Sequence, residues 1–174
     1  VAVFLATTLS RAQAIREPAW AGSFYNSDKA GLSAQIEEYL KKVQGLPVLT
    51  TDPLALIAPH AGYAYSGPTA AYAYRLVQGK PYETVIVIGP SHRYGFEGCS
   101  IYLKGGFETP LGVAPVDEDL ASRIAQRSGF SYIAEAQLKE HSVEVQIPFI
   151  QATLPTAKIV PIVMGFQTKR TISS

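Results

Sequence analysis

The stretch LALIAPHAGYAY, residues 54–65, decides the fold that we expect for this chain. Its apolar run at 54–58 is typical of a strand buried on both faces of a sheet, and the run ends abruptly at His60. A second run, TVIVIG at 84–89, ends in the same way shortly before His92. Two apolar strands separated by a helix indicate a β-α-β unit, so the sequence predicts a largely parallel sheet.

Length and composition favour one globular domain and exclude several classes of partner. The 174 residues suit a single domain, and 47% of them are hydrophobic while 17% are charged. A net charge of +1 gives no electrostatic reason to expect nucleic acid or an anionic membrane as a partner. Cys99 is the only cysteine, so the chain forms no internal disulfide. Nothing in the composition predicts an oligomeric state.

Residues 1–14, VAVFLATTLSRAQA, stand apart from the rest of the chain. A short apolar run followed by Ala12-Gln13-Ala14 is similar to the core and cleavage site of a secretory signal, and it is too short to span a bilayer. We expect either the remnant of a signal peptide or a disordered extension. The first predicts an exported or periplasmic protein, and the second a cytoplasmic one.

The remaining residues, 15–174, are expected to form one α/β domain with a mixed, largely parallel sheet flanked by helices. Besides 54–58 and 84–89, we expect strands at 99–103 and 158–164, the latter near an edge because of Pro161, and a loop at 107–112. We expect helices at 29–43, 68–77 starting at Pro68, 118–127 capped by Asp117, and 143–153 capped by Ser142 and shortened by Pro148. Because a core strand is normally followed by a covering helix, we also expect sequence beyond residue 174.

The two histidines that follow strands are the first candidates for a site. In a parallel sheet the carboxyl ends of neighbouring strands meet at one edge, where ligands bind, so His60 and His92 should lie side by side. Imidazole is the commonest metal ligand in proteins, and a shared metal or catalytic site is our hypothesis. The alternative is that both are loop histidines that bond to the backbone.

His141, the third histidine of the chain, precedes a predicted helix. The positive end of the helix dipole disfavours protonation there, and a neutral imidazole can act as a general base; the alternative is a histidine without chemistry. Trp20 and Tyr65 either line a pocket or pack as ordinary aromatic residues. The sequence contains no nucleophile elbow, dinucleotide fingerprint or phosphate-binding loop, which disfavours nucleotide chemistry.

Six stretches of the chain resemble the Memo family, also called AmmeMemoRadiSam system protein B. They are REPAWAGSFY (16–25), IAPHAGYAYSG (57–67), VIVIGPSH (85–92), TPLG (109–112), EHSVEVQIPF (140–149) and IVPIVMG (159–165). The resemblance implies a fold similar to that of the class III extradiol dioxygenases, which are non-haem iron enzymes.

The resemblance also assigns roles to the candidate residues. It implies that His60 and His92 are metal ligands for Fe(II) or copper, that His141 is the counterpart of the dioxygenase base, and that Trp20 and Tyr65 line the same cavity. The family's third ligand lies beyond the VPIVMG stretch and is absent here. The implied function is a metal-dependent redox enzyme acting on a small aromatic substrate. The alternatives are a non-catalytic module that binds a small ligand or peptide in the same pocket, and a metal-assisted hydrolase.

Overall fold

The computed structural model describes residues 15–169, so the predicted signal remnant or extension at 1–14 lies outside the described residues. Its helices are α1 (Lys29–Lys41), α2 (Tyr63–Arg75), α3 (Glu118–Ala125), α4 (Ala134–Leu138), α5 (His141–Glu144) and α6 (Ile147–Thr153). Its strands are β1 (Ile15–Arg16), β2 (Thr84–Pro90), β3 (Cys99–Ile101), β4 (Gly106–Thr109), β5 (Gly112–Pro115), β6 (Phe130–Ser131) and β7 (Lys158–Met164). The predicted α/β class is confirmed.

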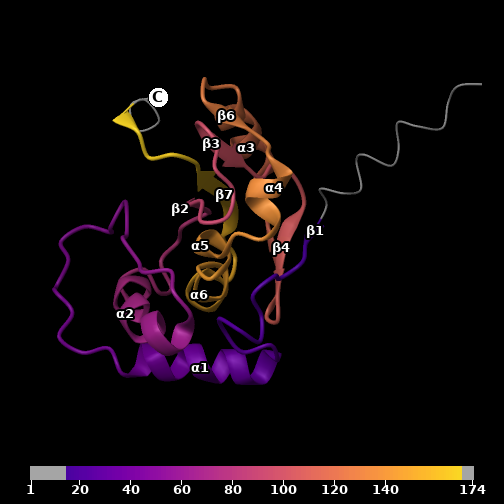
Figure 1. The fold of residues 1–174 in the computed structure, drawn as a ribbon. Coiled ribbons are helices and arrows are strands. Elements are labelled where there is room, and N and C mark those ends of the chain that lie inside the picture. The colour runs from indigo at the N-terminus through magenta and orange to yellow at the C-terminus, as the bar shows by residue number, and fades with distance from the viewer. Residues whose placement is uncertain (1–14, 170–174) are drawn as a thin grey trace, which may run out of the picture.

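The strands form two mixed sheets flanked by helices rather than one sheet (Figure 1). The larger sheet has the order β2-β7-β3-β6, in which β2 is parallel to β7 and β3 is antiparallel to β7. The smaller sheet has the order β1-β4-β5. None of the described helices has the length and apolar character that a bilayer crossing requires.

The prediction of a strand at 54–58 is wrong. The predicted β-α-β unit, which needed this strand and the one at 84–89, is therefore wrong as well. Residues 54–58 have no regular secondary structure, and the side chains of Leu54 and Ile57 are fully exposed. Figure 1 shows this part of the chain in a long loop between α1 and α2. An apolar run becomes a strand only when a neighbouring strand satisfies its backbone groups, and among the described residues β2 pairs only with β7.

Three other local predictions are also wrong. The expected loop at 107–112 is a hairpin, in which β4 pairs antiparallel with β5. Helix α2 begins at Tyr63, so Pro68 lies inside it rather than at its first position. Strand β7 lies between β2 and β3, and not at an edge, despite Pro161. The carbonyl of Pro161 accepts a hydrogen bond from the Tyr102 N–H just beyond the end of β3. Because β3 has ended there, the N–H group that Pro161 lacks is not required for the pairing of β7 with β3.

Two helix predictions are confirmed by their caps. Helix α1 occupies most of the predicted range, and the Asp28 carboxylate accepts a hydrogen bond from the Gly31 N–H. Helix α3 is capped by Asp117, as expected, through the Leu120 N–H. Such side chains satisfy backbone donors that have no partner within the helix. The predicted helix at 143–153 is instead divided into α5 and α6, and Pro148 lies in the first turn of α6.

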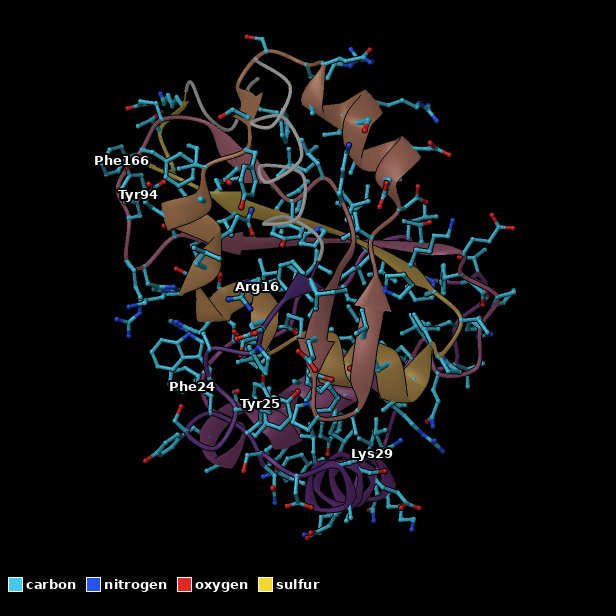
Figure 2. The ribbon with its side chains drawn as sticks, turned by 90° about the vertical axis from the view of Figure 1, so that its right-hand side faces the viewer. Arg16, Phe24, Tyr25, Lys29, Tyr94 and Phe166 are labelled. Carbon is cyan, nitrogen blue, oxygen red and sulfur yellow. The ribbon has the colours of Figure 1, made fainter. Side chains whose placement is uncertain are left out.

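A buried ion pair ties the first described residues to the centre of the molecule. The Arg16 guanidinium lies 2.7 Å from the Glu144 carboxylate, and both side chains are almost completely buried. Arg16 also donates to the carbonyls of Gln137 and Glu140, while Glu144 accepts from the Tyr25 hydroxyl. Figure 2 shows Arg16 and Tyr25 directed into the interior from the first segment of the chain. Removing one member of a buried pair leaves the other charge uncompensated.

We therefore expect Glu144→Gln to lower the free energy of unfolding by about 3–5 kcal/mol, because Arg16 would keep a buried charge without a counterion. Urea denaturation measures the change. Glu37→Gln is the matched control, since Glu37 pairs with Lys41 on the exposed surface of α1 and such pairs contribute less than about 1 kcal/mol. Equal losses in the two variants would contradict the assignment.

Candidate functional site

All three histidines of the chain meet in one cluster, which we call the three-histidine cluster. Their ring centroids are 5.1 Å apart for His60 and His92, 6.0 Å for His60 and His141, and 4.4 Å for His92 and His141. One ring nitrogen from each lies within 4.8 Å of the others, which is close enough to hold a metal ion. The expectation that His60 and His92 lie side by side is confirmed, and His141 joins them.

We expected each histidine to follow a strand that ends at the same edge of the sheet. This holds for His92 but not for His60. His92 follows β2 directly after Ser91, whose N–H donates to the Met164 carbonyl of β7. His60 follows an irregular segment instead, and a side chain from another element fixes that segment. The Gln146 amide donates to the Pro59 carbonyl at 3.0 Å, and Gln146 in turn accepts from the Tyr74 hydroxyl.

His141 reaches the cluster because α5 packs tightly against the end of β2. The Ser142 hydroxyl donates to the Pro90 carbonyl at 2.8 Å. Gly89 makes this approach feasible, since a Cβ at that position would overlap the Ser142 side chain. The rings of His92 and His141 consequently stack at an interplanar angle of 26°.

Glu140 connects His92 at the end of β2 to His141 at the start of α5. Its buried carboxylate accepts hydrogen bonds from the His92 N–H at 2.6 Å and from the N–H groups of His141 and Ser142 at 2.9 Å. The same carboxylate lies 2.9 Å from Nδ1 of His92. A carboxylate only accepts, so Nδ1 of His92 donates this hydrogen bond, and in the neutral ring Nε2 then carries no proton, which is the usual arrangement for a metal-binding histidine.

The charge state of Glu140 follows from these bonds. Burial raises the pKa of the Glu140 carboxyl, but the hydrogen bonds from His92 and Ser142 outweigh burial and hold that pKa below its usual value. Glu140, and not the predicted Ser142, also caps α5. Sequence reasoning gave Glu140 no role, although an acidic residue directly before a histidine at a helix start was a usable signal.

Two of the histidines favour the neutral form. Burial lowers the pKa of His60 and also that of His141, and neighbouring histidines lower both further, against the opposing effect of Glu140. Nδ1 of His141 is buried without a hydrogen-bond partner; it lies 3.4 Å from Glu140. Neutral imidazoles and one unpartnered ring nitrogen suit a bound metal ion.

An aromatic wall stands beside the cluster. The rings of Trp20 and Phe24 contact the His141 ring, with centroids 5.6 and 4.9 Å away, and the Arg93 guanidinium stacks 4.5 Å from the Trp20 ring. Neither Phe24 nor Arg93 was singled out by the sequence. Tyr65, which the resemblance assigned to the cavity, lies on the first turn of α2 with 87% of its surface exposed. The opening at the cluster is lined by residues 57–61, His92 and His141, and does not include Tyr65.

Sequence comparisons find relatives of this chain over most of its length. The family model described as Memo-like protein matches residues 16–174. The chain is 45% identical over 168 residues to a MEMO1 family protein of Pyrobaculum aerophilum, and 42% identical over 164 residues to one of Methanothermobacter thermautotrophicus. Each match covers 90% of this chain but only 58% and 59% of the two relatives. The chain therefore spans less than two thirds of the length of these relatives.

We expect the stability of the chain to fall as the pH drops from about 7.5 to 5.5. The pKa values of His60 and His141 are lowered by folding, so the unfolded chain binds more protons once the pH approaches the ordinary histidine value of about 6.5. The loss continues until the pH passes the folded-state values. Urea denaturation at several pH values measures the slope.

The double variant His60→Gln/His141→Gln should show a flatter slope over the same range, because two of the groups that take up protons on unfolding are gone. Tyr72→Phe, which changes no group that titrates in this range, is the control. An unchanged slope in the double variant would show that other groups cause the pH dependence.

Proposed function

Because the chain belongs to the Memo-like protein family, we propose that its three-histidine cluster is the metal centre of an oxidoreductase acting on a small aromatic substrate. The observation that supports this is the convergence of three imidazoles beside a buried carboxylate. Imidazole ligands suit iron and copper, and Fe(II) or copper is the ion that we propose.

His60 and His92 are the proposed ligands. The hydrogen bond from Nδ1 of His92 to Glu140 leaves Nε2 available as the ligand atom and raises its basicity. The pKa of His60 is lowered mainly by burial, so its ring is neutral near pH 7 and can donate a lone pair. A bound redox-active ion with open coordination positions would supply the electron transfer and oxygen activation that non-haem sites perform.

His141 is the proposed proton-transfer group. Its ring is neutral because burial lowers its pKa, and it lies against the His92 ring in the same cluster. A neutral imidazole can take the hydroxyl proton of an aromatic diol as that oxygen binds.

The proposed substrate contacts are Trp20 and Tyr65. The Trp20 ring is fixed by a hydrogen bond from its indole N–H to the Lys139 carbonyl and by its contact with His141, and it offers a flat surface for an aromatic ring. Arg93 above Trp20 adds a positive charge that favours an anionic substrate. Tyr65 would contact the substrate from the exposed side of α2.

One observation favours the alternative of a binding module without turnover. The side chain of His92 is 39% exposed, whereas enzymes generally exclude water from their reacting groups. In this alternative the same cluster and Trp20 would hold a small ligand or a peptide. The two proposals share the site and differ in whether a substrate is consumed.

We expect the chain to bind one equivalent of Fe(II) or copper and to become more stable by about 2.7 kcal/mol at a metal concentration 100 times Kd. Elemental analysis and thermal denaturation measure these effects. His60→Ala and His92→Ala should remove both, whereas Tyr72→Ala, which alters an exposed aromatic residue of α2, should remove neither.

His141→Gln separates the proton-transfer role from the ligand role. This variant should keep the metal and lose oxygen uptake with a catechol, which an oxygen electrode measures. Loss of metal in His141→Gln would make His141 a ligand instead. Metal binding by the unmodified chain with no oxygen uptake, but with saturable catechol binding, would support the binding module.

Glu140→Gln should weaken metal binding by about 10–100-fold, because the amide no longer offers the charge that orients His92 and increases its basicity. Isothermal titration with the metal ion measures the affinity. Glu135→Gln on the exposed side of α4 is the matched control. If Glu140→Gln binds metal like the control while unfolding normally, the positioning role is wrong.

A further inference from the structure

Arg93 is a cation beside the three-histidine cluster that has no counterion. It follows His92 directly in the chain, and its guanidinium lies 4.5 Å from the centre of the Trp20 ring. Among residues 15–169, no carboxylate forms an ion pair with Arg93 and no acceptor takes a hydrogen bond from its side chain. The N–H donors of this guanidinium are therefore available to a ligand.

The two buried carboxylates of the site are already fully used. Glu140 accepts four hydrogen bonds, from the ring and backbone of His92 and from two N–H groups of α5. Glu144 also accepts four, one of them from its ion-pair partner Arg16. A carboxylate has about four positions that accept hydrogen bonds, so neither group is free to pair with Arg93.

The ring beneath Arg93 is held in place. The Trp20 indole N–H donates to the Lys139 carbonyl at 3.1 Å, and the Phe24 ring packs against Trp20 at a centroid distance of 4.5 Å. A guanidinium stacked on an aromatic ring is held by its face and keeps its N–H edges open for hydrogen bonds. Less conformational entropy is then lost when a ligand binds to those edges.

The charge of Arg93 reaches the cluster. Burial is the main cause of the lowered pKa of His141, and the positive charge of Arg93 contributes to it. The Trp20 ring also contacts the His141 ring. A ligand bound against the cluster is therefore within the electrostatic influence of Arg93, and an anionic group on that ligand is attracted to it.

A carboxylate is the anion that matches this geometry. The edge of a guanidinium presents two parallel N–H groups, which pair with the two oxygens of one planar carboxylate. We propose that Arg93 and Trp20 form a carboxylate-binding subsite, and that the aromatic ligand of the cluster carries a carboxylate group. This inference rests on the proposed binding of a small aromatic ligand at the cluster, but it requires neither metal nor turnover.

The test compares two ligands of similar shape in metal-free buffer near pH 7. Isothermal titration should show that 3,4-dihydroxybenzoate binds about tenfold more tightly than 4-methylcatechol, in which a methyl group replaces the carboxylate. A hydrogen bond between charged groups at an exposed site is expected to give a preference of this size. Trp20 is the only tryptophan of the chain, so its fluorescence should change when the acid binds.

Three variants test the roles of Arg93 and Trp20. Arg93→Gln should remove the preference for the acid, because the amide carries no charge. Arg93→Lys should keep only part of it, because an ammonium group keeps the charge but lacks the two parallel donors. Trp20→Leu should also reduce the preference, because the guanidinium loses the ring that holds it.

Arg123→Gln is the matched control. Arg123 is an exposed arginine of α3, and the cap of that helix, Asp117, bonds to Thr84 at the opposite end of β2 from His92. This variant should keep the full preference for 3,4-dihydroxybenzoate.

Three results would overturn the inference: equal affinities for the two ligands, a preference that persists in Arg93→Gln, or binding of the acid without a change in Trp20 fluorescence. Oxygen uptake with catechol, which has no carboxylate, tests the proposed enzyme separately. Uptake without any preference for the acid would contradict this inference alone. A preference for the acid without uptake would support the subsite and favour the binding module.

Discussion

The candidate site depends on one buried carboxylate, that of Glu140. It accepts backbone hydrogen bonds from His92 and from the first two residues of α5, and it lies against the His92 ring. Each of these donors would otherwise be an unsatisfied N–H group near the end of a strand or the start of a helix. A single charge thus caps α5, closes the turn after β2 and selects the tautomer of His92.

Glu144, one helical turn further on, makes the corresponding connection to the first segment of the chain. Through Arg16, Tyr25 and the Trp20 N–H it fixes the segment that carries the aromatic wall beside His141. Glu140, which caps α5, and Glu144, its last residue, therefore hold different sides of the site, although the helix is only four residues long. Buried charges of this kind are costly unless every partner is in place, so the site and the fold around it are expected to be gained or lost together.

A cavity adjoins the candidate metal centre. It lies between the irregular segment 53–58 and β2, and its mainly apolar lining includes His60. Because His60 also belongs to the three-histidine cluster, the cavity and the cluster are adjoining parts of one surface.

The sequence by itself determined the α/β class, the helices near 29–43 and 118–127, the strand at 84–89 and the choice of His60, His92 and His141 as candidate site residues. These follow from local patterns: apolar periodicity, capping side chains and rare residue types at the ends of apolar runs. Only the tertiary structure decided that 54–58 is not a strand, that β7 is central despite Pro161, and that Glu140 joins the histidines. The physical reason is that strand pairing and buried hydrogen bonds need partners distant in sequence, and a local pattern records only the residue's preference and not whether its partner is present.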